Sequence, residues 1–137
     1  MKNEVFILDS NIWISYVITR KLDKLVSLIH RHQLIVLTCL PLIQELQEVL
    51  MRPKFKKYLG KSDLREIIAI HLKICRIVDI DDTPMQLSDP KDYFLLNLYN
   101  KGEASQLVSG DKELIREAGE LNYGTMTLRE FELTYLV

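Results

Sequence analysis

The chain alternates between short uninterrupted hydrophobic runs and longer stretches in which apolar and polar residues mix. Residues 5–8 and 34–37 each contain four successive apolar side chains, a pattern typical of strands buried on both faces of a sheet. A third run, Leu107-Val108, continues into Ser109. These runs predict three core strands. Residues 76–80 predict a short or edge strand, and residues 124–127 a final short one.

Between the runs, apolar residues recur every three or four positions, which is the spacing of a helix with one buried face. This spacing, together with the capping residues, predicts seven helices. The first begins near Ile12, and the next three cover 21–32, Pro41 to about Arg52, and Ser62 or Asp63 to Ile74. The last three cover 88–102, 111–119 and 128–136. Because strands alternate with helices, we predict an α/β fold. Its form would be a three-layer α/β/α sandwich around a central parallel sheet of about four or five strands.

Composition changes this picture little. The chain has 137 residues, of which 47% are hydrophobic and 27% charged, enough apolar material for one buried core. It contains no internal repeat or linker, so we expect a single domain over residues 1–137. The formal net charge of −1 gives no global electrostatic reason to expect a nucleic acid or a membrane partner. Any such partner must be argued from local clusters of charge.

Two features indicate a cytoplasmic protein with no membrane association. Cys39 and Cys75 stand alone, without a Cys-x-x-Cys pair, as expected for buried thiols in a reducing compartment. The N-terminal hydrophobic run is interrupted by Asp9, and residues 34–43 contain Thr38 and Pro41. We therefore expect neither a signal peptide nor a membrane-spanning helix.

Acidic side chains lie where the predicted sheet would place a ligand site. Asp9 ends the first strand and Asp111 follows the third, and open parallel sheets bind ligands at the carboxyl ends of their strands. Successive residues of a helix are about 100° apart, which puts Glu45 beside the apolar stripe and Glu48 further towards solvent. Asp92 lies in the first turn of its helix. These positions predict an acidic pocket formed by Asp9, Glu45, Asp92 and Asp111.

Such a pocket predicts metal chemistry. Crowded carboxylates raise one another's pKa, and a divalent cation relieves the repulsion. A site made of carboxylate oxygens, without histidine or cysteine, favours Mg²⁺ or Mn²⁺ over Zn²⁺. Ions of this kind polarise phosphodiesters and lower the pKa of a bound water. The implied reaction is phosphodiester hydrolysis.

Each acid also has a purely structural interpretation, which the sequence leaves open. Asp9 and Asp111 could cap the helices that follow them. Glu45 could be a surface glutamate. Asp92 could interact with the dipole of its helix, since Asp89 already stands at the cap position. The functional interpretation depends on the order and spacing of the acids rather than on any one of them.

The spacing of these residues resembles that of the PIN-domain ribonucleases, in particular the prokaryotic VapC-like toxins. The resemblance covers nearly the whole chain in family order. The matching pieces are Leu8-Asp9-Ser10-Asn11, Glu45, Asp89-Pro90-Lys91-Asp92 and Val108-Ser109-Gly110-Asp111-Lys112-Glu113-Leu114. It implies a metal-dependent endoribonuclease whose catalytic, metal-holding acids are Asp9, Glu45, Asp92 and Asp111.

The same resemblance implies further roles and partners. Asn11 and Ser109 would orient a carboxylate or a water. Asp89 competes with Asp92 for the third acidic position, and we prefer Asp92 as the second Asp of the Asp-Pro-Lys-Asp element. Related proteins often form homodimers and are held inactive by a small antitoxin, so both associations are expected here.

A basic segment is the candidate RNA contact. Residues 52–61 carry five positive charges and no acid, interleaved with Phe55 and Tyr58, which suits phosphate contacts and base stacking. The segment could equally be a solvated connection between helices. Its candidate RNA-binding residues are Arg52, Lys54, Lys56 and Lys57. His30 and His32 are expected at the surface rather than on a metal, and His71 could lie at the core edge or face the groove.

Three other protein classes share parts of this pattern. A haloacid-dehalogenase-like phosphatase also begins with a strand ending in Asp, but it needs a second carboxylate two residues on, where this chain has Asn11. A response-regulator receiver would need paired early acids and a late strand-end lysine, which are not evident. A catalytically inactive PIN-like module that binds RNA or protein remains as the non-enzymatic alternative.

Overall fold

The computed structural model describes residues 4–59 and 63–135, and its centre is a parallel sheet. Five strands lie in the order β3-β2-β1-β4-β5, and all neighbouring pairs are parallel. Their bounds are Val5–Leu8 for β1, Ile35–Thr38 for β2, Arg76–Ile77 for β3, Gln106–Val108 for β4 and Thr125–Met126 for β5. Ile7 pairs with Leu37 on one side and with Leu107 on the other. The carboxyl ends of the three longest strands therefore meet at one edge.

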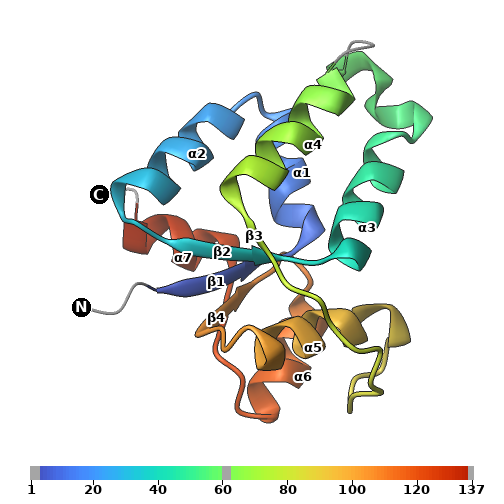
Figure 1. The fold of residues 1–137 in the computed structure, drawn as a ribbon, viewed down its shortest axis with the longest axis vertical. Helices are drawn as coiled ribbons and strands as arrows, with labels where there is room; N and C mark the ends of the chain where they lie inside the picture. Colours follow the sequence, from blue (N-terminus) through green and yellow to red (C-terminus); the bar gives the residue numbers. More distant parts are fainter. Residues whose placement is uncertain (1–3, 60–62, 136–137) are drawn as a thin grey trace.

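Helices cover both faces of the sheet (Figure 1). One layer is formed by α1 (Ser10–Ile18), α2 (Leu22–Arg31), α4 (Asp63–Ile74), α7 (Leu128–Tyr135) and most of α3 (Leu40–Leu50). The other is formed by α5 (Tyr93–Lys101) and α6 (Lys112–Glu120). Two short 3₁₀ helices, η1 (Pro53–Tyr58) and η2 (Pro90–Asp92), follow α3 and precede α5. The predicted three-layer α/β/α fold is confirmed.

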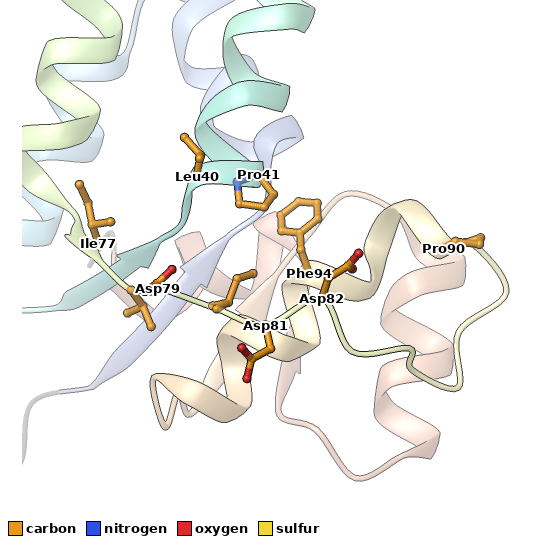
Figure 2. Close-up of a pocket in the computed structure, with 10 residues that line it drawn as sticks. Leu40, Pro41, Ile77, Asp79, Asp81, Asp82, Pro90 and Phe94 are labelled. Atoms are coloured by element: carbon orange, nitrogen blue, oxygen red, sulfur yellow. The ribbon is translucent and has the colours of Figure 1, made fainter.

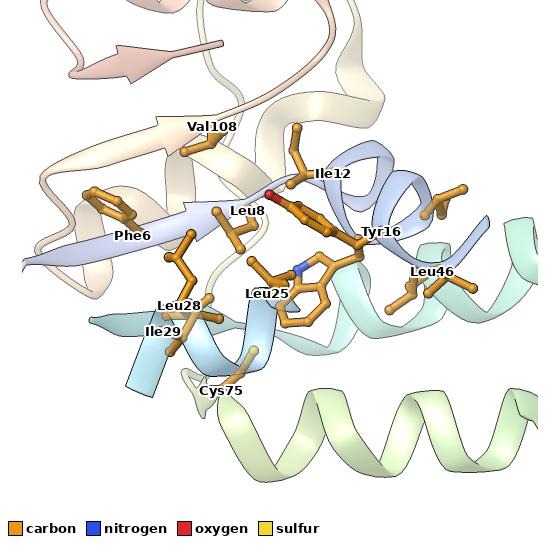
Figure 3. Close-up of a cluster of buried hydrophobic side chains, with 14 of the residues drawn as sticks. Phe6, Leu8, Ile12, Tyr16, Leu25, Leu28, Ile29, Leu46, Cys75 and Val108 are labelled. Carbon is orange, nitrogen blue, oxygen red and sulfur yellow. The ribbon is translucent and has the colours of Figure 1, made fainter. Parts of the chain in front are cut away.

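The alternation of side chains along β1 produces two separate cores. Phe6 and Leu8 point into the larger cluster, whereas Ile7 points into the smaller one under α5 and α6. Figure 3 shows the larger cluster, in which side chains from α1, α2 and α3 gather against β1. Phe6 is fully buried and meets Phe131 edge to face at 5.6 Å between ring centroids. A strand buried on both faces accounts for the uninterrupted hydrophobic run.

Most predicted elements are present, with shifted ends. Strands β3 and β5 are shorter than the predicted 76–80 and 124–127. The helix predicted from residue 88 begins instead with the 3₁₀ turn η2, in which Asp89 is the cap and Pro90 occupies the first turn, where its missing amide hydrogen is not needed. The predicted start at Ser62 and end at residue 136 lie outside the described residues. In the described part of the chain, no helix is long and apolar enough to cross a membrane.

Candidate acidic site

Asp9 stands at the carboxyl end of the central strand, between β1 and α1. Its side chain is only 5% exposed. Oδ1 accepts a hydrogen bond from the backbone N–H of Ser10 at 2.7 Å, and Oδ2 accepts one from the Ser109 hydroxyl at 2.8 Å. Burial raises the pKa of Asp9 to about 6, although these hydrogen bonds favour the charged form. A buried carboxylate with a raised pKa is a common feature of functional sites.

Asn11 and Ser109 connect the loops that follow β1 and β4. The Asn11 amide nitrogen lies 3.3 Å from Asp9 Oδ2, and its oxygen accepts from Gly110 N–H at 3.0 Å. The Ser109 hydroxyl donates to Asp9 and accepts from Asp111 N–H at 3.0 Å. Both side chains therefore hold the Asp9 carboxylate against the loop that carries Asp111.

Asp111 is the N-cap of α6, as its structural interpretation anticipated. Its Oδ1 accepts hydrogen bonds from the backbone N–H groups of Glu113 and Leu114 at 3.0 and 3.2 Å. The same carboxylate raises the pKa of both Asp9 and Asp92, so it lies within electrostatic reach of them. Asp111 can therefore cap α6 and also belong to the acidic cluster.

Asp92 is the acid most affected by its neighbours. It ends η2, and its pKa is raised to about 7, first by burial and then by the charges of Asp9, Asp89, Asp111 and Glu45. Asp89 is exposed, and its Oδ1 accepts from the Lys91 N–H at 3.0 Å, so it caps η2. This difference supports the preference for Asp92 over Asp89 as the site residue.

Glu45 reaches the cluster from α3. It is half-buried, and its Oε2 accepts a hydrogen bond from the Ser10 hydroxyl at 2.8 Å. Glu48, one turn further along, is exposed. The predicted orientation of the two glutamates is confirmed, because Glu45 faces α1 and the sheet edge rather than solvent. Its charge raises the pKa of Asp9 and of Asp92.

The four acids are of the chemical type that binds a hard divalent cation, but their side chains as they lie do not surround a common point. All four candidate ligands offer carboxylate oxygens, which Mg²⁺ and Mn²⁺ prefer. Among the described residues, however, no three acidic, histidine or cysteine side chains surround one point closely enough to hold a metal ion. Binding an ion through three of these carboxylates therefore requires some of the side chains to change rotamer, and the bound cation would offset the repulsion between their charges.

The predicted RNA contact lies apart from the acids, at the far end of α3 (Figure 1). Its described cationic side chains are exposed, and they are Arg52, Lys54, Lys56 and Lys57. Phe55 and Tyr58 are half-buried, and Phe55 packs against the larger core. The ammonium groups of Lys54 and Lys57 lie 5.1 Å from the adjoining rings. The fifth cation, Lys61, lies outside the described residues.

The hydrogen bonds found for the histidines do not involve the acids of the site. His30 and His32 are exposed, as predicted. His71 is fully buried; its Nε2 lies 2.8 Å from Thr38 Oγ1, and its ring packs edge-on against Trp13. Burial lowers its pKa to about 4, so it stays neutral in the core. Cys39 and Cys75, also as predicted, are free buried thiols.

Sequence reasoning missed a groove beside the site. Figure 2 shows it between the start of α3 and the segment after β3, with a volume of about 600 Å³. Leu40 and Ile77 at its wall are 62% and 59% exposed. Its other lining residues include Pro41, Phe94, Asp79, Asp81 and Asp82. The acids at 79, 81 and 82 of the sequence were a signal, but the apolar wall forms only when residues of α3 and β3 come together.

The fold and the site together define an α/β protein with carboxylates gathered at the carboxyl edge of a parallel sheet. The model of the PIN domain family matches residues 5–113, and the chain belongs to this family. A chain in the crystal structure of VapBC2 from Rickettsia felis bound to a DNA fragment from their promoter has a similar fold. The two are 12% identical with a TM-score of 0.61, over 90% of this chain and 98% of that chain. No curated protein matches the chain.

Proposed function

We propose that the protein is a metal-dependent endoribonuclease that hydrolyses RNA phosphodiester bonds and acts as the toxin of a toxin–antitoxin pair. The observation that carries this proposal is a set of hydrogen bonds at one edge of the sheet: Ser10 links Asp9 to Glu45, and Ser109 links Asp9 to the backbone of Asp111. The charges of these three acids also raise the pKa of Asp92. These acids come from four different elements at one edge of the sheet. Carboxylates gathered in this way destabilise the metal-free protein, so a functional role accounts for them better than a structural one.

The four acids would hold Mg²⁺ or Mn²⁺, which supplies an activated water and polarises the phosphodiester. Asp9 is the best oriented of them, because Ser109 and the Ser10 N–H fix both of its oxygens. Asn11 ties this carboxylate to the loop before Asp111. The protein's contribution is therefore to hold the acids in place and to present them at an accessible edge of the sheet.

The basic segment around η1 would bind the RNA backbone outside the acidic site. Exposed cations there attract phosphates, while the acids repel them unless a metal is bound. The partner in such a system would be a small antitoxin protein, and a homodimer is the proposed assembly. The similarity to a VapBC2 structure supports the antitoxin partner only through the shared fold.

The haloacid-dehalogenase-like alternative has less support. Its second carboxylate would occupy the position of Asn11, whose amide instead bonds to Asp9 and to Gly110. An inactive RNA- or protein-binding module is the second candidate, because the side chains as they lie do not form a ready-made metal site in the described residues.

Cleavage of a fluorogenic single-stranded RNA, with and without Mn²⁺, tests the proposal. We expect Mn²⁺-dependent cleavage that falls at least a hundredfold in Asp9→Asn and in Glu45→Gln. The matched control is Glu48→Gln, which removes an exposed carboxylate from the same helix. RNA retention without cleavage, unchanged by Asp9→Asn, would favour the binding module. Cleavage of small phosphomonoesters but not of RNA would favour the phosphatase.

A further inference from the structure

Ser10 lies between two of the acids and contacts both. It is the first residue of α1 and is only 7% exposed. Its backbone N–H donates to Asp9 Oδ1 at 2.7 Å, and its hydroxyl donates to Glu45 Oε2 at 2.8 Å. One small residue thus joins the carboxylate that ends β1 to the carboxylate that projects from α3.

Glu45 depends on this contact for its orientation. A glutamate has three rotatable side-chain bonds, and fixing them costs conformational entropy that a specific contact must offset. In the described part of the chain, the one hydrogen bond found for the Glu45 side chain is the bond from Ser10. Without that donor, the half-buried carboxylate is free to turn towards solvent beside Glu48.

We propose that Ser10 is a positioning residue that holds Glu45 in the acidic site through its hydroxyl. The inference rests on the proposed function, because it concerns how the acids are prepared for a divalent cation. Its physical basis is that a hydrogen bond to a carboxylate ligand fixes the direction of the ligand's oxygens. Removal of such a partner typically costs tenfold to a hundredfold in metal affinity.

The test uses isothermal titration of the metal-free protein with Mn²⁺, a measurement that does not depend on RNA cleavage. Ser10→Ala removes the hydroxyl and keeps the backbone N–H to Asp9, and we expect about tenfold weaker Mn²⁺ binding. Ser10→Thr retains a hydroxyl and should recover most of the affinity. Ser15→Ala, on the same helix but with no side-chain contact to the acids, is the control and should bind as the unaltered protein does.

A double-mutant cycle shows whether Ser10 acts through Glu45. If it does, adding Ser10→Ala to Glu45→Gln leaves the affinity within about twofold of Glu45→Gln alone. An equal decrease in both backgrounds overturns the inference, as does a Ser10→Thr variant no better than Ser10→Ala. Should Ser10→Ala fail to fold, Ser10→Gly also removes the hydroxyl and keeps the backbone N–H to Asp9, and the same decrease in affinity is expected.

Two outcomes separate this inference from the proposed function. If the unaltered protein and Ser10→Ala bind Mn²⁺ and cleave RNA equally well, the positioning role of Ser10 is wrong and the nuclease proposal stands. If the unaltered protein binds no Mn²⁺, both the positioning role and the metal-dependent nuclease proposal are wrong.

Discussion

At the scale of single residues, the acidic site is a balance between burial and hydrogen bonding. Asp9 and Asp92 both have raised pKa values, to about 6 and about 7, and burial is the largest cause for each. In Asp9 hydrogen bonds offset part of this rise in pKa, whereas in Asp92 the other contributions add to it. Asp9 accepts hydrogen bonds from Ser10 and Ser109, which favour its charged form, whereas the effects on Asp92 beyond burial are the charges of neighbouring acids. Asp92 is therefore the acid whose ionisation most opposes folding.

Asp92→Asn should stabilise the metal-free protein at neutral pH. A carboxyl whose pKa is raised by folding keeps its proton longer in the folded state, so stability falls as pH rises from about 4 to about 7. The variant does not undergo this decrease. We expect a gain of roughly 1–2 kcal/mol above pH 7, after allowance for solvent screening, and almost none at pH 4.

Urea unfolding in the presence of a chelator at pH 4, 5.5, 7 and 8 measures this gain. Asp23→Asn, which alters an exposed acid on α2, is the matched control. A gain that is the same at every pH would show that the effect of Asp92→Asn is not electrostatic.

At the scale of elements, the site depends on how two helices begin. The caps Asp9 and Asp111 start α1 and α6 directly after β1 and β4, so the helix caps are also the acids of the site. Asp111 accepts from two backbone N–H groups of α6 while its charge acts on Asp9 and Asp92. The structural and the functional interpretations of this residue both apply, and two substitutions can separate them.

Asp111→Asn and Asp111→Ala should have equal effects on cleavage but different effects on stability. Asparagine caps a helix about as well as aspartate, so Asp111→Asn should unfold within about 0.5 kcal/mol of the unaltered protein. Alanine cannot accept the two hydrogen bonds, and Asp111→Ala should be about 1 kcal/mol less stable. Both remove the charge and should lower cleavage at least a hundredfold.

Denaturant melts beside the RNA assay make this comparison. Activity that survives in Asp111→Asn would mean that the residue serves only as a cap.

At the scale of the whole molecule, charge is unevenly distributed although the total is −1. Cations gather at η1, while acids gather at the carboxyl edge of the sheet and along the groove after β3. Arg116 on α6 forms ion pairs with Glu113 and Glu120 of its own helix, and among the described residues no ion pair is found between the cations of η1 and the four acids of the site. A polyanion would therefore approach by way of η1.

Replacing Lys54, Lys56 and Lys57 by Gln should weaken RNA binding and leave the chemistry intact. We expect KM to rise about tenfold at low salt with kcat within twofold, because exposed cations that touch phosphates act on binding. The salt dependence of binding should become shallower, by about 0.7 in the logarithmic slope for each phosphate that the variant no longer neutralises.

The matched control replaces three other exposed lysines, Lys21, Lys24 and Lys101, by Gln. An equal rise in KM in both triple variants would show that η1 has no special role and that only the overall charge matters.

The sequence by itself determined the elements and their class. Four successive apolar residues at 5–8 need cover on both faces, and that local requirement is enough to predict a parallel sheet between helices. The sequence also placed Asp9 and Asp111 directly after strands and Glu45 beside the apolar stripe of a helix, because the periods of helices and strands are local properties.

Only the tertiary structure decided what these residues touch. The bond from Ser10 to Glu45 spans 35 residues, and the bond from Ser109 to Asp9 spans 100. The burial of His71 likewise requires α4 to pack on α1 and β2. Such contacts depend on strand order and helix packing, which no local pattern encodes, and burial and pKa follow from them. For this reason the sequence could name the acids, whereas the tertiary structure decided that they share one environment.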